Sequence, residues 1–145
     1  THVPTHQRGV GMVFQDNQLF PHLTVGENVA FGLKMAGTPS VVRRSTADDW
    51  LARVGLAGFG SRDVSALSGG EAKRVALART LAVEPSVVLL DEPLTGLDRE
   101  LHDRLAHDVA ALLADLAITA ILVTHDPDEA ATIAVRSLHM DDING

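Results

Sequence analysis

An apolar run that ends in two adjacent carboxylates constrains the fold of this chain most strongly. Residues 87–90 are Val-Val-Leu-Leu, and Asp91 and Glu92 follow directly. A short continuous run of branched apolar residues is typical of a strand buried on both faces, as in a parallel sheet covered by helices. Such sheets bind ligands at the carboxyl ends of their strands. The run therefore predicts an α/β fold that presents both acids at a binding edge.

Two further apolar runs end in polar residues in the same way. Residues 9–14 are predicted to form a short buried strand with Gln15 just past its end. Residues 118–123 are predicted to form a second fully apolar strand, and His125 follows it closely. Because the carboxyl ends of parallel strands meet at one edge of a sheet, we expect these polar side chains to converge with the two acids of the first run.

A loop with two glycines precedes the central run. Ser68 has the side chain of a helix N-cap, and Glu71 completes a capping box three residues later, with Gly69 and Gly70 between them. The glycines let a ligand approach bare backbone, and the free N–H groups at a helix N-terminus attract anions. The loop is therefore a candidate phosphate-binding site.

In this order and spacing, the motifs resemble those of the ATP-binding-cassette (ABC) ATPases. Residues 66–71 (Ala-Leu-Ser-Gly-Gly-Glu) resemble the signature motif, and residues 87–93 resemble the Walker B strand. The resemblance covers nearly the whole chain. Three shorter stretches resemble the Q-loop, the D-loop and the switch histidine of the family, at residues 13–15, 94–98 and 123–126.

The resemblance implies a role in ATP hydrolysis for each polar residue at the strand ends. Gln15 and Asp91 would hold Mg²⁺, Glu92 would be the general base, and His125 would sense the γ-phosphate. The chemistry of each side chain agrees, because phosphoryl transfer needs a metal that neutralises charge, a positioned water, and donors directed at the γ-phosphate. ATP and Mg²⁺ are therefore the expected cofactors.

The resemblance also implies a second cassette as partner. In this family two cassettes pack head to tail, and the signature loop of each closes on the ATP held by the other. Two positions depart from the usual pattern without removing a reacting group: Glu71 stands where Gln is common, and residues 95–98 are Thr-Gly-Leu-Asp where Ser-Ala-Leu-Asp is common. The residues assigned to nucleotide binding by resemblance are Gln15, Ser68, Gly69, Gly70, Glu71 and Asp98.

The fold implied by the resemblance is α/β, with a partial P-loop NTPase (RecA-like) parallel sheet and the ABC helical subdomain. Residues 1–20 and 84–145 are expected to form the partial core, and residues 21–83 the helical subdomain. A short strand over residues 136–140 is expected without an assigned place in the sheet. The other three strands are expected in the order 9–14, 86–90 and 118–123.

Capping residues predict where the helices start. Thr24 is predicted to cap a helix over residues 25–35, and Asp98 a long helix over residues 99–116. Pro39 is expected at the first position of the helix between them. The side chains expected on buried faces are Val42, Trp50, Leu51, Val54, Val75, Ala76, Leu77, Leu81 and Val83, whereas His102 and His107 are expected on the surface.

The phosphate-cradle pattern of nucleotide sites, G-x-x-x-x-G-K-[ST], has no match in this sequence. Neither Lys34 nor Lys73 follows a glycine. We therefore expect an N-terminally truncated ABC subunit without a Walker A loop, inactive alone. Residues 118–123 would then be an exposed apolar sheet edge, through which the isolated chain is expected to form oligomers.

The segment from Leu19 to Glu27 is expected to dock a transmembrane permease. Leu19, Phe20 and Leu23 are apolar residues in a predicted loop, which calls for burial or a partner. In the family this region receives a helix of the membrane subunit. The stretch from Leu19 to Val25 also resembles importer cassettes for inorganic ions, polyamines or thiamine, so import is the expected direction of transport.

Composition limits the partners and the location. The net charge of −7 argues against sequence-independent binding to nucleic acid, and the absence of cysteine excludes thiolate metal sites. The longest apolar stretch, residues 105–124, is interrupted by charged residues and is too polar to span a bilayer. We expect no signal peptide here, because residues 1–11 are polar and contain no apolar segment. We expect a cytoplasmic protein, peripheral on the inner face of the cell membrane through its partner.

Two other functions remain open from the sequence. The chain could be an interaction module that does not hydrolyse ATP and supplies a signature face or a permease dock to a partner. Intact Gln15, Glu92 and His125 argue against this reading, because a non-catalytic module need not keep them. The chain could also belong to an ABC protein that acts on DNA or ribosomes, although such proteins usually carry two cassettes or long insertions.

Overall fold

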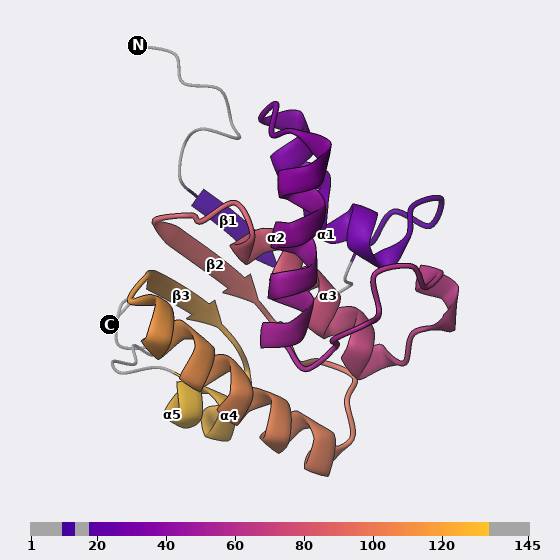
Figure 1. The fold of residues 1–145 in the computed structure, drawn as a ribbon. Helices are drawn as coiled ribbons and strands as arrows, with labels where there is room; N and C mark the ends of the chain where they lie inside the picture. The colour runs from indigo at the N-terminus through magenta and orange to yellow at the C-terminus, as the bar shows by residue number, and fades with distance from the viewer. Residues whose placement is uncertain (1–9, 14–17, 134–145) are drawn as a thin grey trace.

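The computed structural model describes residues 10–13 and 18–133. Three strands and five α-helices make up this part of the chain, with one short 3₁₀-helix, η2 (Val64–Ala66), before α3 (Figure 1). The strands are β1 (Val10–Val13), β2 (Val87–Asp91) and β3 (Thr119–Val123), and the helices are α1 (Val25–Met35), α2 (Ser40–Arg53), α3 (Gly69–Leu81), α4 (Arg99–Leu116) and α5 (Pro127–Ile133).

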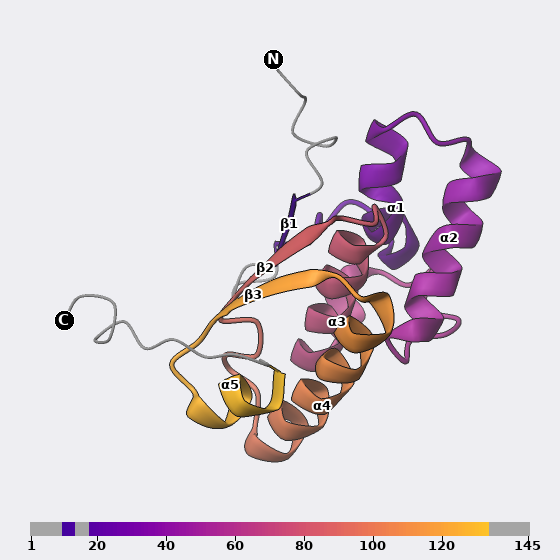
Figure 2. The same cartoon turned by 90° about the vertical axis from the view of Figure 1, so that its left-hand side faces the viewer.

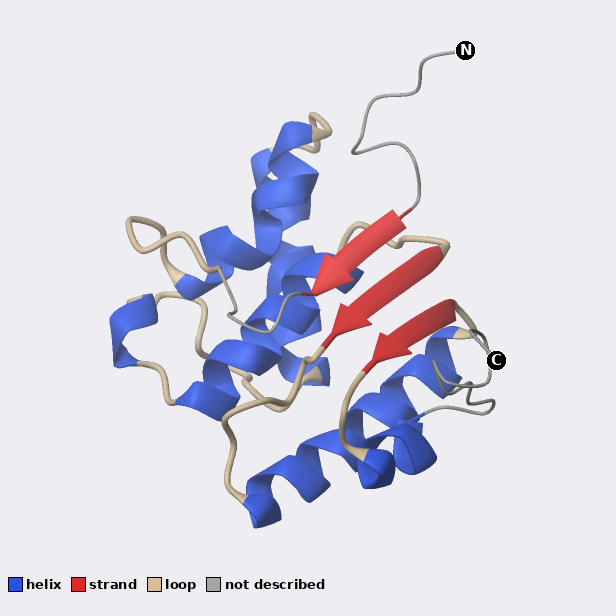
Figure 3. Cartoon of the chain, turned by 180° about the vertical axis from the view of Figure 1, so that it is seen from behind, coloured by secondary structure: helices blue, strands red, loops and turns tan. Residues whose placement is uncertain are grey.

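The three strands form one parallel sheet in the order β1-β2-β3, as the sequence predicts. Val87 of β2 lies opposite Val10 of β1 and Thr119 of β3, so the three strands are closely in register. Their carboxyl ends therefore meet at one edge (Figure 3). The strand expected at residues 136–140 lies outside the described residues.

The sheet is covered on one face. Helices α3 and α4 lie against this face in the side view of Figure 2, and Val88 and Leu90 of β2 are fully buried there. On the opposite face, Ile121 and Val123 of β3 are 52% and 47% exposed. Within the described part of the chain, β3 is also an edge strand, paired on one side only.

Helices α1, α2 and α3 pack together into a helical unit beside the sheet. Thr24 caps α1, as predicted, and forms a capping box. Its hydroxyl accepts the Glu27 N–H, and the Glu27 carboxylate accepts the Thr24 N–H. The division at residues 21–83 stays a prediction. The fully buried side chains of this unit include Val25, Val29 and Val75, with Leu51 at 1% exposure.

Three details of the helices differ from expectation. Pro39 is the N-cap of α2 and not its first residue. Val42 is 52% exposed, whereas the buried residues of α2 are Ala47, Trp50 and Leu51 in its second half. Val83 is exposed because α3 ends at Leu81, so this residue falls outside the buried stripe of the helix.

None of the helices in the described residues is both long enough and apolar enough to cross a membrane.

Candidate functional site

Glu92 and His125 meet at the carboxyl ends of the two neighbouring strands β2 and β3. The Glu92 carboxylate oxygen Oε1 contacts Nδ1 of His125, which pairs the two groups directly. The Glu92 side chain is 14% exposed, whereas the His125 side chain is 96% exposed. The Glu92 N–H donates to the Val123 carbonyl at 2.8 Å, which continues the β2–β3 pairing beyond the end of β2. The pairing of two strands therefore brings an acid and an imidazole together.

The turn after β2 holds the Glu92 side chain from its other side. The hydroxyl of Thr95 donates to Glu92 Oε2 at 3.2 Å, so each carboxylate oxygen has one partner. Glu92 also has a backbone φ of +47°, a conformation that is uncommon for residues other than glycine and often found at functional sites. Sequence reasoning missed Thr95, although this residue lies where the D-loop departs from the usual family pattern.

An open cleft of about 900 Å³ surrounds the Glu92–His125 pair. The cleft is bounded by the turn after β2, the first turns of α4, and the turn that leads from β3 into α5. Its polar lining is both acidic and basic, which suits a ligand with donors, acceptors and a bound cation. The lining residues are Glu92, Leu94, Thr95, Gly96, Leu97, Arg99, His102, His125, Asp126, Pro127, Asp128 and Glu129.

Of the two predicted metal ligands, Asp91 and Gln15, only Asp91 lies among the described residues. Asp91 is the last residue of β2 and is partly exposed, so its carboxylate stands at the strand-end edge beside Glu92. An oxygen donor at this place has the chemistry that Mg²⁺ prefers. Gln15 lies outside the described residues, and β1 ends two residues before it at Val13.

The signature loop forms a helix N-terminus, as its sequence predicts. Ser68 is the N-cap of α3, and its hydroxyl accepts the Glu71 N–H at 3.2 Å. The Glu71 carboxylate accepts the Ser68 N–H at 2.9 Å in return, which completes the capping box. Ser68 and Gly69 are exposed, so a ligand can reach the start of the helix.

The same loop rests on the start of α4. A Cβ atom at Gly70 would lie 2.9 Å from Leu101 Cδ2, whereas a Cβ at Gly69 would meet Leu97 Cδ2 at an ordinary 3.8 Å. Asp98 caps α4 by accepting the Leu101 N–H at 2.9 Å. The structure therefore places the signature residues against the D-loop segment.

The predicted site residues thus form two groups. Asp91, Glu92 and His125 stand at the strand ends, and the signature loop stands with Asp98 at the start of α4. Arg99, next to Asp98, links the groups because its guanidinium contacts Asp126, the neighbour of His125, at 2.8 Å. This arginine lowers the pKa of Asp126, and the hydrogen bond that Arg99 donates to the Asp126 carboxylate raises the pKa of Arg99.

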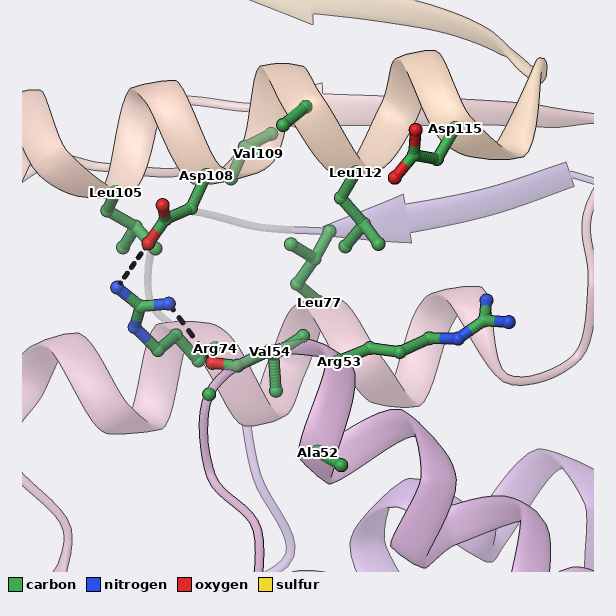
Figure 4. A pocket seen from close by; sticks show the side chains of 12 residues that line it. Ala52, Arg53, Val54, Arg74, Leu77, Leu105, Asp108, Val109, Leu112 and Asp115 are labelled. Carbon is green, nitrogen blue, oxygen red and sulfur yellow. Dashed lines mark hydrogen bonds and ion pairs between the residues drawn. The ribbon is translucent and has the colours of Figure 1, made fainter.

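Arg74 of the signature helix α3 joins this helix to α4 and to the end of α2. This guanidinium donates to Asp108 of α4 at 2.8 Å and to the Val54 carbonyl at the end of α2 at 3.0 Å. Figure 4 shows both interactions at the mouth of a pocket of about 350 Å³ between the three helices. The pocket lining includes none of the predicted site residues. We therefore interpret the pocket as a packing gap between the three helices and not as a functional site.

His102 corrects a sequence expectation, because the residue is buried and not on the surface. It is 7% exposed, and its Nε2 lies 3.0 Å from Glu129 Oε2 on α5. Burial alone would lower the pKa of His102, but the carboxylates of Glu129, Asp103 and Asp126 outweigh burial and raise it. Burial raises the pKa of Glu129, with His102 partly opposing this effect.

A sequence signal for His102 existed. The buried positions of α4 include residues 102, 105, 109 and 113, which share the helical period of the apolar stripe. His102, Asp126 and Glu129 each offer one ligand atom within 4.8 Å of the others, a set that could hold a metal ion. The Arg99 guanidinium already contacts the Asp126 carboxylate, however, so this cluster carries a cation of its own.

Comparison with known proteins gives one family. The sequence profile of the family described as "ABC transporter" matches residues 1–95. The chain is 49% identical over 138 residues to the "Fe(3+) ions import ATP-binding protein FbpC" of Streptomyces avermitilis, which covers 95% of this chain and 40% of that protein. It is 46% identical over 142 residues to the protein of the same name from Rhizobium etli, covering 98% of this chain and 40% of that protein.

A relative named for another substrate has a similar level of identity. The "Spermidine/putrescine import ATP-binding protein PotA" of Spiroplasma citri is 46% identical over 139 residues, or 96% of this chain and 40% of that protein. The chain therefore spans about 40% of the length of the curated relatives that it matches.

Proposed function

Because the chain belongs to the ABC transporter family, we propose that it is part of the ATP-binding subunit of an importer, which binds and hydrolyses Mg-ATP to drive solute transport across a membrane. The observation that carries this proposal is the contact between Glu92 and His125 at the carboxyl ends of neighbouring parallel strands. Ligands of open parallel sheets bind at this edge, and ATP hydrolysis needs both an acid and a donor there. Relatives named as import ATP-binding proteins support the direction of transport.

Each residue of the strand-end group has a proposed task. Glu92 accepts a proton from the attacking water, and Thr95 and His125 keep its carboxylate in place from either side. Asp91 would hold Mg²⁺ together with Gln15, and the bound ion would neutralise phosphate charge. His125, almost fully exposed, donates to the γ-phosphate when nucleotide enters the cleft.

The signature group is proposed to act on a neighbouring cassette. Ser68, Gly69, Gly70 and Glu71 form a helix N-terminus, which attracts phosphate, and Ser68 and Gly69 are exposed there. None of the four residues lines the cleft of the strand-end group. This separation supports action in trans, in a head-to-tail pair with a second cassette, with Asp98 at the interface. The chain alone is proposed to be inactive, because its sequence has no phosphate-cradle pattern.

The segment from Leu19 to Glu27 is proposed as the permease dock. Phe20 is less available for docking than its sequence suggests, since its ring packs on Phe31 with centroids 4.6 Å apart and its N–H donates to the Asn28 side chain at 2.8 Å. Pro21, His22 and Glu27 are exposed and form the available surface. Docking here would place the protein in the cytoplasm, on the inner face of the membrane.

The proposal can be tested in a chimera. The matched segment of the Streptomyces avermitilis relative is replaced by this chain, and the product is purified with the permease of that relative. We expect Mg-dependent ATP hydrolysis and retention of the permease, and we expect His22→Glu to weaken permease binding while hydrolysis by the free cassette is unchanged. Gln18→Glu, an exposed change just outside the dock, is the control for His22→Glu.

The same experiment separates the alternative function. A chimera that retains the permease but does not hydrolyse ATP, although it binds the nucleotide, would favour a non-catalytic interaction module. The names of the relatives indicate Fe(3+) and polyamines as the substrates to test first in transport assays.

A further inference from the structure

The start of α5 is held on α4 by a buried ion pair that the proposed mechanism does not use. His102 Nε2 lies 3.0 Å from Glu129 Oε2 and 3.4 Å from Asp126 Oδ2. Both members of the main pair are buried, with side chains 8% and 3% exposed. The other Glu129 oxygen, Oε1, makes no hydrogen bond within the described part of the chain. His102 is the principal compensating group for this carboxylate, and the Thr124 side chain makes a smaller contribution.

Two carboxylates face the His102 ring, and this geometry favours its protonated form. Its second nitrogen, Nδ1, lies 3.2 Å from Asp103 Oδ1, so a carboxylate faces the ring at both ends. A neutral imidazole donates from one nitrogen only, and its other nitrogen would then point a lone pair at a carboxylate. The imidazolium donates at both ends. The pair is therefore strongest while His102 carries its second proton, because a neutral ring can donate to only one of the two carboxylates.

The pair is connected to His125 through one short turn. Asp126 follows His125 directly, and its Oδ1 accepts the N–H groups of Asp128 at 2.9 Å and Glu129 at 3.2 Å. Holding Glu129 therefore also holds Asp126 and the turn before it. Arg99 strengthens the same turn through its contacts with Asp126 and Asp128.

We propose that His102 is a positioning residue. Its ion pair with Glu129 holds the start of α5 against α4, and this keeps the preceding turn, which carries His125, beside Glu92. Loss of the second proton of His102 weakens this ion pair and thereby loosens the Glu92–His125 contact. The proposal rests on the proposed function for its meaning in ATP hydrolysis, but the positioning itself is independent of nucleotide.

Several charged groups surround His102 and determine the pH at which it loses its proton. On α4 these are Arg99 and Asp103, and at the start of α5 they are Asp126, Asp128 and Glu129. Glu92 and His125 line the same cleft. The acids outnumber the cations in this group, and His102 is buried among them, in agreement with the raised pKa of His102.

The test is an NMR experiment without nucleotide, at pH 6 and at pH 9, on the 145-residue chain carrying Ile121→Lys. This change on the exposed side of β3 is expected to limit self-association, and every variant below is made in this background. The readout is the nuclear Overhauser cross-peak between the His125 ring and the Glu92 side chain. In the background chain we expect the cross-peak at pH 6 and its loss at pH 9. His102→Arg carries a permanent cation and should keep the cross-peak at both values, whereas His102→Leu should lack it at both. His107→Gln, an exposed change on the same helix, should behave as the background chain.

Two results would overturn the proposal. Loss of the cross-peak at pH 9 in His102→Arg would assign the change to His125 itself. A cross-peak in folded His102→Leu would show that the ion pair with Glu129 is not needed to hold His125 beside Glu92. If His102→Leu does not fold, His102→Arg decides alone. Because no ATP is present, a failed proposed function would leave these outcomes unchanged and can be recognised separately in the chimera.

Discussion

At the scale of single residues, the candidate site is organised around the Glu92 carboxylate. One oxygen contacts His125, the other accepts the Thr95 hydroxyl, and the backbone of Glu92 adopts the left-handed conformation that directs the chain into the next turn. A carboxylate with both oxygens engaged by neighbours is held in one orientation. Preorganisation of this kind is what a general base requires.

Replacing Thr95 by valine removes the hydroxyl and keeps the shape of the side chain. We expect kcat of the chimera to fall by roughly 5-fold, since the hydrogen bond contributes about 1 kcal/mol to the orientation of Glu92. Steady-state ATP hydrolysis measures this effect. Thr95→Ser keeps the donor and should retain most of the activity, and equal losses in the two variants would contradict the role given to the hydroxyl.

The two glycines of the signature loop, Gly69 and Gly70, differ in the room that they leave for an alanine side chain. At Gly70 the added carbon lies 2.9 Å from Leu101 Cδ2, so the leucine has to move, whereas at Gly69 the contact with Leu97 is ordinary. We expect Gly70→Ala to be less stable than Gly69→Ala by up to about 1 kcal/mol, because the terminal methyl of Leu101 has to shift and this offsets part of the gain in helix propensity. Urea unfolding of both variants measures the difference, and a more stable Gly70→Ala would contradict the tight packing.

At the scale of elements, the sequence predicts the helices and strands well and some of their contacts poorly. The capping residues Thr24, Ser68 and Asp98 mark the helix starts, because a side chain oxygen that accepts a backbone N–H leaves a local signal. The buried pair of His102 and Glu129 joins residues 27 positions apart on two helices, and local signals do not report such pairs. Val42 shows the same limit, since its exposure depends on where α2 meets its neighbours.

The joint between α4 and α5 should make stability depend on pH. The pKa of His102 is raised in the folded chain, so its contribution to stability is full below about pH 6.5, the ordinary value, and is lost as pH rises through the folded value. The raised pKa of Glu129 has the same sign. We expect the urea midpoint of the chain to fall between pH 6 and pH 9, and to fall less in His102→Arg. An equal fall in the two chains would contradict this origin.

At the scale of the whole molecule, the sequence predicts the fold class and the strand order, and the structure agrees with both. A parallel sheet with helices α3 and α4 on one face places every described strand end at one edge, where the candidate site lies. The exposed face and edge of β3 could be anticipated from the expected strand order. The contact of the signature loop with Leu101 could not, because it depends on how α3 and α4 pack.

The exposed side of β3 should lead the isolated chain to self-associate. Ile121 and Val123 are about half exposed on an edge strand, a surface that favours pairing with another chain. Light scattering at high concentration should show oligomers, and Ile121→Lys should reduce them. Val41→Lys, which alters a side chain 80% exposed on α2, is the matched control. A monodisperse monomer would contradict this prediction.

The central claim is that Glu92 is the general base of an ATP-hydrolysing site, and its amide variant tests this claim most directly. Glu92→Gln in the chimera should lower kcat by roughly 10²-fold or more while ATP binding is retained, because the amide cannot accept the proton of the attacking water. Glu100→Gln is the matched control, since Glu100 is an exposed acid of α4 that pairs with Arg104. A Glu92→Gln chimera that hydrolyses ATP at the rate of the Glu100→Gln control would contradict the account.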